Sequence, residues 1–288
     1  MESEEPTKIN PYNFNNKLLT LDKVKELFIQ YDIIEEPRDL SLYQDAFVHK
    51  SYSLKKNEEI IKEMGIVDKP EGALELVKDN NERLEFFGDS IIGLVVAKYV
   101  FERFYQENEG FLTKIKTKLV RCDALGYFAK ELKFGEYLII SRHIEDKCNG
   151  RTSTAILENT FEAFIGAMFL DFNDIEIDSY DFYSGIGFQI CEKFLINLIE
   201  EKVDFAELIM NNDNHKDTLL KYFQKTYQQP AKFEVLNIEL VNNSKLFNVA
   251  VYDTNNEQIG LGNGSSKKKA EQMASKDALI KLKIIDEC

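Results

Sequence analysis

Three acidic residues are spaced so that one face of a helix would carry all of them. Glu82, Glu85 and Asp89 lie three and four positions apart, which makes them neighbours on a helix surface. The same stripe continues into the apolar residues Ile92 and Val96. A solvated acidic face is the usual explanation of such a triplet, but the flanking residues leave little of this helix polar. Buried carboxylates are costly unless a cation compensates them, so the stripe indicates a cation site.

A second apolar segment repeats the pattern. Glu162 is the only charged residue in 161–170, Asn159 shares its stripe, and small residues around Gly166 would let another helix approach. Packing the two helices together would form one pocket of oxygen ligands, from Glu85, Asp89, Asn159 and Glu162. Such ligands suit Mg²⁺ or Mn²⁺, which serve phosphoryl transfer by activating water and stabilising the leaving oxygen. The alternative is a salt-bridged pair of core helices, although few Lys or Arg share these stripes.

Two groups of cations could meet a phosphate backbone. Lys114, Lys118 and Arg121 form a positive helix face, which a solvated surface explains equally well. Near the C-terminus, Ser265 or Ser266 is a good N-cap for a helix that starts with lysines. Cations oppose the positive end of a helix dipole, and a bound anion would reverse that interaction. Nucleic-acid phosphates fit this end best, because no P-loop pattern surrounds its three lysines, Lys267, Lys268 and Lys269.

The elements that would position these residues fall into successive segments. We expect a polar, Asn-rich tail over 1–20 that docks late or not at all, and a helical domain over 21–205. The charged stretch 55–80 looks like an inserted loop with a short helix. A linker over 206–213 would lead to a unit over 214–284 with α-β-β-β-α order.

The apolar patterns also predict individual elements. Buried helices are expected at 82–105 and 153–170, with one or two amphipathic helices between them that end near Gly135. In the last unit the pattern predicts one helix, three strands and a second helix, at 217–227, 233–240, 245–253, 257–262 and 266–282.

Composition bounds the class of protein. The 288 residues suit two folded units, and the net charge of −14 argues at first against a polyanion partner. Residues 214–283 hold eleven Lys, no Arg and seven acids, a net charge of +4 that leaves −18 for the rest of the chain.

Four scattered Cys fit free thiols in a reducing compartment, and no apolar run would span a membrane. We expect a cytoplasmic protein, with a nuclear or virus-associated location left open.

With these residues in view, the chain resembles ribonuclease III, a family of double-stranded RNA endonucleases. The resemblance extends over about 21–282 and is most specific in four ordered blocks of the helical part and in one block near the C-terminus. The C-terminal block, GNGSSKKKAEQMAS, resembles a double-stranded RNA-binding domain. The four helical blocks are DAFVHKSYS (45–53), NERLEFFGDS (81–90), EGFLTKIKTKLVR (109–121) and ENTFEAFIGAMFLD (158–171).

The resemblance implies a multidomain protein, with an all-α endonuclease domain followed by a small α+β RNA-binding domain. It implies a homodimer through the signature helix, in which each site cuts one strand and leaves a 5′-phosphate, a 3′-hydroxyl and a short 3′ overhang. By position, Glu85 and Glu162 would bind catalytic Mg²⁺, with Mn²⁺ a possible substitute, and Asp89 would position water or ligand. Glu82 and Glu109 would be neighbouring acidic residues that contact RNA or the outer shell of the site. Further contacts with the duplex are expected from Lys114, Lys118, Arg121, Lys216, Ser265, Ser266, Lys267, Lys268 and Lys269.

The sequence departs from the family pattern at several positions. The family usually has Asp where this chain has Asn159, so we expect weakened or altered metal use. The alternative is a double-stranded RNA-binding protein with an inactive or weakened nuclease domain, and a dimer without any RNA role is a third hypothesis. Leu220 replaces a polar minor-groove residue, and the loop 242–245 lacks the usual His. The insertion and the tail suggest a divergent eukaryotic or large-virus member, and the sequence leaves the physiological RNA open.

Overall fold

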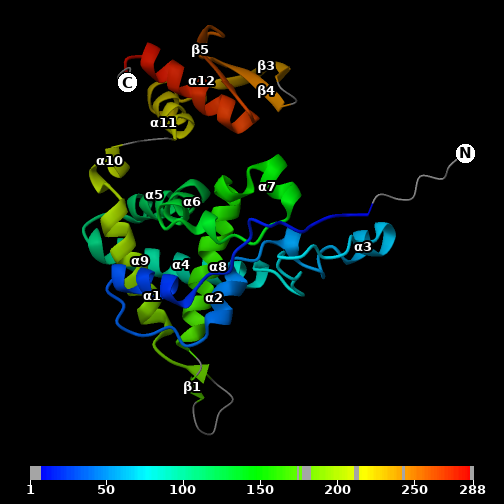
Figure 1. Ribbon diagram of the computed structural model, residues 1–288. Coiled ribbons are helices and arrows are strands. Elements are labelled where there is room, and N and C mark those ends of the chain that lie inside the picture. The colour runs from blue at the N-terminus through cyan, green and yellow to red at the C-terminus, as the bar shows by residue number, and fades with distance from the viewer. Residues whose placement is uncertain (1–7, 174, 177–182, 211–213, 242–243, 286–288) are drawn as a thin grey trace, which may run out of the picture. The chain divides into compact units, whose positions relative to one another are not determined.

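The computed structural model describes residues 8–173, 175–176, 183–210, 214–241 and 244–285 (Figure 1). The chain divides into two compact units, Met1–Leu208 and Ile209–Cys288, and each is described by itself. The first unit is helical and the second has the order α-β-β-β-α, so the predicted fold class is confirmed. Among the described residues, no helix is long and apolar enough to cross a membrane.

The first unit contains ten α-helices, counted over the described residues, and the last of them runs across its boundary with the second unit. They are α1 (Leu21–Gln30), α2 (Leu40–Ala46), α3 (Glu58–Met64), α4 (Glu82–Arg103), α5 (Glu109–Leu119), α6 (Cys122–Glu131), α7 (Arg142–Cys148), α8 (Thr154–Asp171), α9 (Gly187–Lys202) and α10 (Phe205–Met210). Three short 3-10 turns (Lys50–Tyr52, Phe134–Glu136, Gly150–Thr152) join them. A two-stranded hairpin of β1 (Ile175–Glu176) and β2 (Tyr183–Ser184), which the sequence reading did not predict, follows α8.

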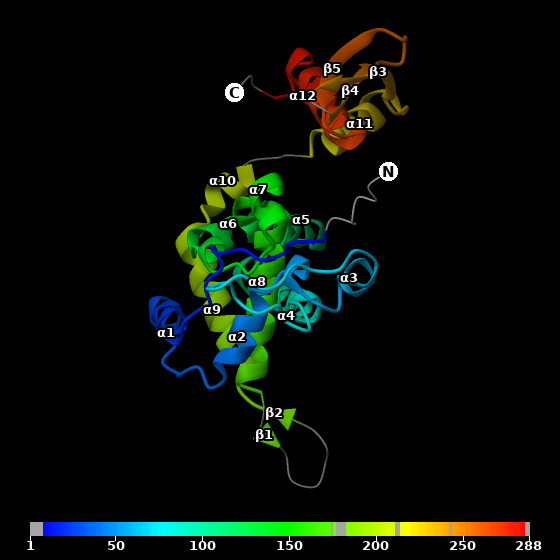
Figure 2. The same ribbon diagram turned by 45° about the vertical axis from the view of Figure 1, so that its right-hand side comes forward.

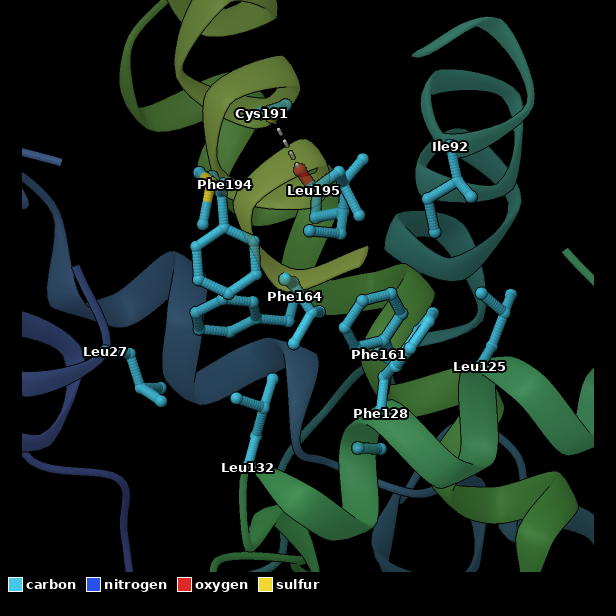
Figure 3. Packing of buried hydrophobic residues seen from close by; sticks show 14 of the residues in the cluster. Leu27, Ile92, Leu125, Phe128, Leu132, Phe161, Phe164, Cys191, Phe194 and Leu195 are labelled. Carbon is cyan, nitrogen blue, oxygen red and sulfur yellow. Dashed lines mark hydrogen bonds between the residues drawn. The ribbon is translucent and has the colours of Figure 1, made fainter. Parts of the chain in front are cut away.

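Helix α8 is the centre of the first unit. It is mostly apolar, and residues 160–168 are all buried because α2, α4, α6 and α9 pack around it (Figures 1 and 2). Its aromatic side chains meet rings from several neighbours, and the centroids of Phe164 and Phe134 are 5.0 Å apart. Figure 3 shows Phe161 and Phe164 among the surrounding core residues, with the Cys191 thiol donating to the Ile165 carbonyl at 3.5 Å.

Helices α4 and α8 cross at a pair of glycines. A Cβ atom on Gly88 would overlap the backbone carbonyl of Glu162, and one on Gly166 would overlap that of Leu84. The two backbones therefore touch, as the small residues around Gly166 predicted. Because any larger side chain would separate the helices, these glycines set how closely the two acidic stripes approach.

The segment predicted to be a tail is packed over residues 8–20. Tyr12, Asn13, Asn16 and Leu19 are buried, and the Asn13 and Asn16 amides donate to the Ile140 carbonyl at 3.2 and 3.0 Å. The prediction from polar composition is wrong for these residues, because the asparagine side chains satisfy backbone groups of the loop before α7. Residues 1–7 lie outside the described residues.

The insertion and the linker contain helices. The short helix expected in the inserted stretch is α3, and Ile9 pairs with Ile66 in a parallel bridge that ties the insertion to the N-terminal segment. Of the predicted linker, residues 206–210 belong to α10, while 211–213 lie outside the described residues.

The second unit is a three-stranded antiparallel sheet with helices on one face. Its elements are α11 (His215–Tyr227), β3 (Lys232–Val241), β4 (Ser244–Tyr252), β5 (Gln258–Gly264) and α12 (Lys267–Lys281), with strand order β3-β4-β5 (Figure 1). The buried Ala270, Ala274 and Ala278 of α12 lie over β5. A Cβ atom on Gly262 would overlap the backbone of Ala274, so it is the α12 backbone that approaches the strand glycines.

Candidate active site and nucleic-acid interface

The α4–α8 crossing brings the predicted acidic residues into one electrostatic cluster. Glu162 lies at the crossing point on α8, where its backbone meets Gly88, and Glu85 and Asp89 lie on either side of Gly88 on α4. Glu162 is 8% exposed, Glu85 is partly buried and Asp89 is exposed. The cluster therefore grades from a buried carboxylate to one open to solvent.

Glu162 is a buried acid without a compensating partner. Within the described part of the chain no hydrogen bond or ion pair reaches its carboxylate. Burial, followed by the charges of Glu158, Asp89 and Glu85, raises the pKa of Glu162 to about 8. Burial and the charge of Glu82 likewise raise the pKa of Glu85. The site thus holds more negative charge than the protein itself neutralises.

These donors fit a hard divalent cation. Carboxylate and amide oxygens are the ligands that Mg²⁺ and Mn²⁺ prefer, and a bound cation would remove the repulsion at Glu162. Among the described residues, no group of three or more His, Cys, Asp or Glu side chains is placed to hold a metal ion by itself. Mg²⁺ commonly keeps several waters and takes phosphate oxygens, so one or two protein carboxylates suffice to hold it beside a bound substrate.

Glu158 is a carboxylate of the cluster that the sequence patterns did not predict as a site residue. Glu158 is partly buried, and its charge acts on Glu162 and on Glu85. Its spacing of four residues from Glu162 was the signal that could have found it. The neighbouring Asn159 is also partly buried, and it contributes an amide in place of a charge.

Glu82 and Glu109 lie at the first turns of two helices. Lys50 and Lys56 form ion pairs with Glu82, at 3.5 and 3.3 Å. Burial would raise the pKa of Glu82, but hydrogen bonds from Lys56 and Asn80 lower it below its usual range. Glu109 is exposed and accepts a hydrogen bond from the Thr113 hydroxyl at 2.9 Å.

The predicted positive face of α5 is not assembled as expected. Lys118 is only 8% exposed, and its ammonium donates to the Leu208 carbonyl at 2.6 Å. Lys114 is partly buried, and Arg121 is exposed and pairs with Asp123 at 2.7 Å. Lys118 therefore holds α10 against α5 and is not placed to meet a phosphate. A stripe of Lys and Arg in the sequence could not reveal this, because the acceptor lies 90 residues away.

The second unit presents its lysines at a helix N-terminus. Ser266 is the N-cap of α12 and accepts a hydrogen bond from the Lys269 backbone N–H at 3.3 Å. Lys267, Lys268 and Lys269 are exposed, and Ser265 beside them is exposed as well. Three ammonium groups therefore lie at the positive end of a 15-residue helix, which favours an anion there.

Lys216 has a different environment from these three lysines. Its ammonium pairs with Glu271 at 2.7 Å and lies 4.7 Å from the centre of the Phe233 ring. The side chain is thus held between α11, α12 and β3, and an RNA phosphate would have to compete with Glu271 for it.

The chain thus joins a helical domain with an acidic helix crossing to an α-β-β-β-α unit whose last helix begins with three lysines. Comparison with known proteins gives the family. Residues 39–174 match the family described as Ribonuclease-III-like, and residues 215–282 match the double-stranded RNA binding motif. The chain belongs to the ribonuclease III family.

Relatives are found in a virus and in bacteria. The probable ribonuclease 3 of Acanthamoeba polyphaga mimivirus is 32% identical over 96% of this chain, which spans about half (48%) of that protein. Ribonuclease 3 of Enterococcus faecalis is 34% identical over 88% of this chain and 95% of its own length. The crystal structure of the ribonuclease III nuclease domain from Campylobacter jejuni covers 63% of this chain and 98% of its own, with 26% identity and a TM-score of 0.44.

Proposed function

We propose that the protein hydrolyses phosphodiester bonds of double-stranded RNA with a divalent metal ion, Mg²⁺ or in its place Mn²⁺. The proposed products carry 5′-phosphate and 3′-hydroxyl ends with short 3′ overhangs. The observation that carries the proposal is the buried Glu162, which has no compensating partner among the described residues and faces further carboxylates at a helix crossing. A duplex-binding unit in the same chain supports RNA as the substrate.

Each residue of the site would have a separate role in this reaction. Glu85 and Glu162 would hold the metal, and the exposed Asp89 would orient the attacking water. When bound, the divalent ion supplies an acidified water and stabilises charge on the leaving 3′ oxygen. The Gly88–Gly166 contact fixes the spacing of the helices that carry these ligands. The lysines of α12 would bind phosphates of the duplex, which is recognised by shape.

Incubation of long duplex RNA with the full chain in Mg²⁺ and in Mn²⁺ tests the enzymatic function. We expect cleavage with at least one ion and a loss of at least about 100-fold in rate on Glu162→Gln, because a metal ligand is removed. Retained RNA binding without cleavage in either ion would favour the alternative, an RNA-binding protein with an inactive or weakened nuclease domain. The amide of Asn159 favours that alternative, and restored cleavage on Asn159→Asp would identify it as the weak point.

The outer face of α4 supports the proposed homodimer. Phe86, Leu94 and Phe101 are exposed apolar residues along one face of this helix. Phe86 also borders a pocket of about 910 Å³ whose apolar lining includes Leu42, Val48, Val77, Phe87 and Leu170. A second copy would cover this surface, and two chains would supply the two sites needed to cut both strands.

A further inference from the structure

Glu158 is a partly buried carboxylate at the acidic crossing that neither the resemblance nor the proposed mechanism uses. It lies four residues before Glu162, so both side chains are on one face of α8. Asn159, beside it, leaves the site one charge short of the pattern that the family usually has. The missing charge and the extra carboxylate are therefore adjacent in the chain.

Helix spacing and the electrostatic effects of its charge place Glu158 within the cluster. Among the neighbouring carboxylates, its charge has the largest effect on Glu162, ahead of Asp89 and Glu85. It also acts on Glu85 across the crossing, and the Cys122 thiol at the start of α6 hydrogen-bonds to it. Glu158 thus lies on the face of α8 that carries Glu162, within reach of the Cys122 thiol of α6.

The protein alone gives no reason to keep a carboxylate there. Like charges four residues apart on a helix repel. Glu162 is a buried acid without a partner, and the negative charges of Glu85 and Asp89 already repel its ionised form. No ion pair to Glu158 is formed within the described residues. The repulsion turns into attraction only when a cation lies among these groups.

We propose that Glu158 supplies the negative charge that Asn159 lacks and acts as a carboxylate of the divalent-metal site, toward Mg²⁺ or Mn²⁺. The inference rests on the proposed function. Cys122 positions the Glu158 side chain by its hydrogen bond, and Glu162 remains the buried ligand against which the ion would be held.

Binding of Mn²⁺ to the full chain without RNA, measured by titration calorimetry, tests the assignment. We expect Glu158→Gln to weaken Mn²⁺ binding about tenfold or more, as the loss of a metal ligand or its supporting group commonly does. Adding Asn159→Asp to Glu158→Gln should restore the affinity, because the charge returns one residue later. The exposed Glu59 on α3 offers the matched control, and Glu59→Gln should leave binding unchanged.

One outcome would contradict only the role of Glu158, and another would contradict the proposed function as a whole. Mn²⁺ binding by Glu158→Gln that is equal to or tighter than that of the natural sequence would overturn the role of Glu158, while cleavage by the natural chain and weakened binding by Glu162→Gln would leave the proposed function intact. If Glu162→Gln also leaves Mn²⁺ affinity unchanged and the natural chain does not cleave, the proposed function itself fails and this inference falls with it. Circular dichroism of each variant checks that the helices are retained.

Discussion

At the scale of single residues, α8 carries two buried carboxylates with opposite surroundings. Asp171 is 2% exposed and accepts hydrogen bonds from the Arg38 and Asp39 backbone N–H groups, at 3.0 and 2.8 Å, and from the Tyr43 hydroxyl at 2.8 Å. Glu162 is nearly as buried, and no such donors reach it among the described residues. Since a buried acid is normally satisfied within the fold, this contrast distinguishes a carboxylate that the fold satisfies from one that is available for the proposed cation.

The raised pKa of Glu162 predicts how metal-free stability varies with pH. The folded state holds a proton on this side chain up to about pH 8, whereas the unfolded chain releases it near its ordinary value of 4.5. The stabilisation is therefore complete below that ordinary value and is lost as the pH rises to about 8, with a slope of at most about 1.4 kcal/mol per pH unit. Denaturant unfolding in EDTA should show this decline, and Glu162→Gln should flatten it.

Glu59→Gln is the control and should keep the slope of the natural sequence, because Glu59 is exposed. Saturating Mg²⁺ should restore stability at alkaline pH, since the ion binds the ionised form. Equal slopes for the natural chain and Glu162→Gln would show that Glu162 does not titrate in this range.

Residue spacing in the sequence revealed the acidic stripes, because helix periodicity is a local property. It did not reveal that Lys118 is buried against Leu208, since that contact depends on chain folding over 90 residues. Glu158 was missed for another reason: it lies on the acidic face by spacing, but it has no counterpart in the resemblance that assigned roles.

At the scale of elements, the outer face of α4 predicts self-association. Phe86 is 78% exposed, and replacing it with Glu would place a charge in the proposed contact. Because buried aromatic residues often contribute 2 kcal/mol or more to an interface, we expect Phe86→Glu to weaken association by about 30-fold or more. Light scattering coupled to size exclusion should then report the mass of one chain in place of two.

Ile29 on α1 offers the comparison for that experiment, since it is 74% exposed on another helix. Ile29→Glu should leave the mass unchanged. A single-chain mass for the natural sequence across the micromolar range, or a dimer that survives Phe86→Glu, would contradict the assignment of this face.

The helix crossing gives a second prediction at this scale. Gly88→Ala would insert a methyl group into the Glu162 backbone and should destabilise the fold by about 1–3 kcal/mol through overpacking. Gly93→Ala, on the same helix, meets nothing within 4 Å and should be neutral or stabilising by up to about 1 kcal/mol. Urea unfolding of both variants in the Phe86→Glu background keeps association out of the comparison. Equal effects of the two alanines would show that the helices do not touch at Gly88.

Elements with a strong local period were predicted well, and those held by distant partners were not. The helices predicted at 82–105 and 153–170 match α4 and α8 within a few residues, because a long apolar helix is visible in the sequence itself. Residues 8–20 lack such a period, and their packing depends on the Ile140 carbonyl and the bridge from Ile9 to Ile66. The β1–β2 hairpin has two residues per strand, too few for an alternating pattern to be seen.

At the scale of the whole molecule, opposite charges are assigned to different tasks. The overall charge of −14 conceals a second unit of net +4 over 214–283 and −18 elsewhere. The acidic crossing explains part of that excess, because bound divalent ions would offset Glu85, Glu158 and Glu162. The acidic part of the chain outside 214–283 also repels RNA, so affinity for a duplex should depend on the basic second unit and on ionic strength.

Replacing Lys267, Lys268 and Lys269 together with Gln tests that dependence. Each lost phosphate contact removes released counterions, so the slope of log affinity against log salt should fall by about 2–3, with a weaker affinity at low salt. Lys281 is an exposed lysine at the opposite end of α12, where it pairs with Asp277 at 2.7 Å, so Lys281→Gln should change neither quantity appreciably. Filter binding of a duplex to the full chain in EDTA, over a salt series, measures both without cleavage. An unchanged slope in the triple variant would place the phosphate contacts elsewhere than at the start of α12.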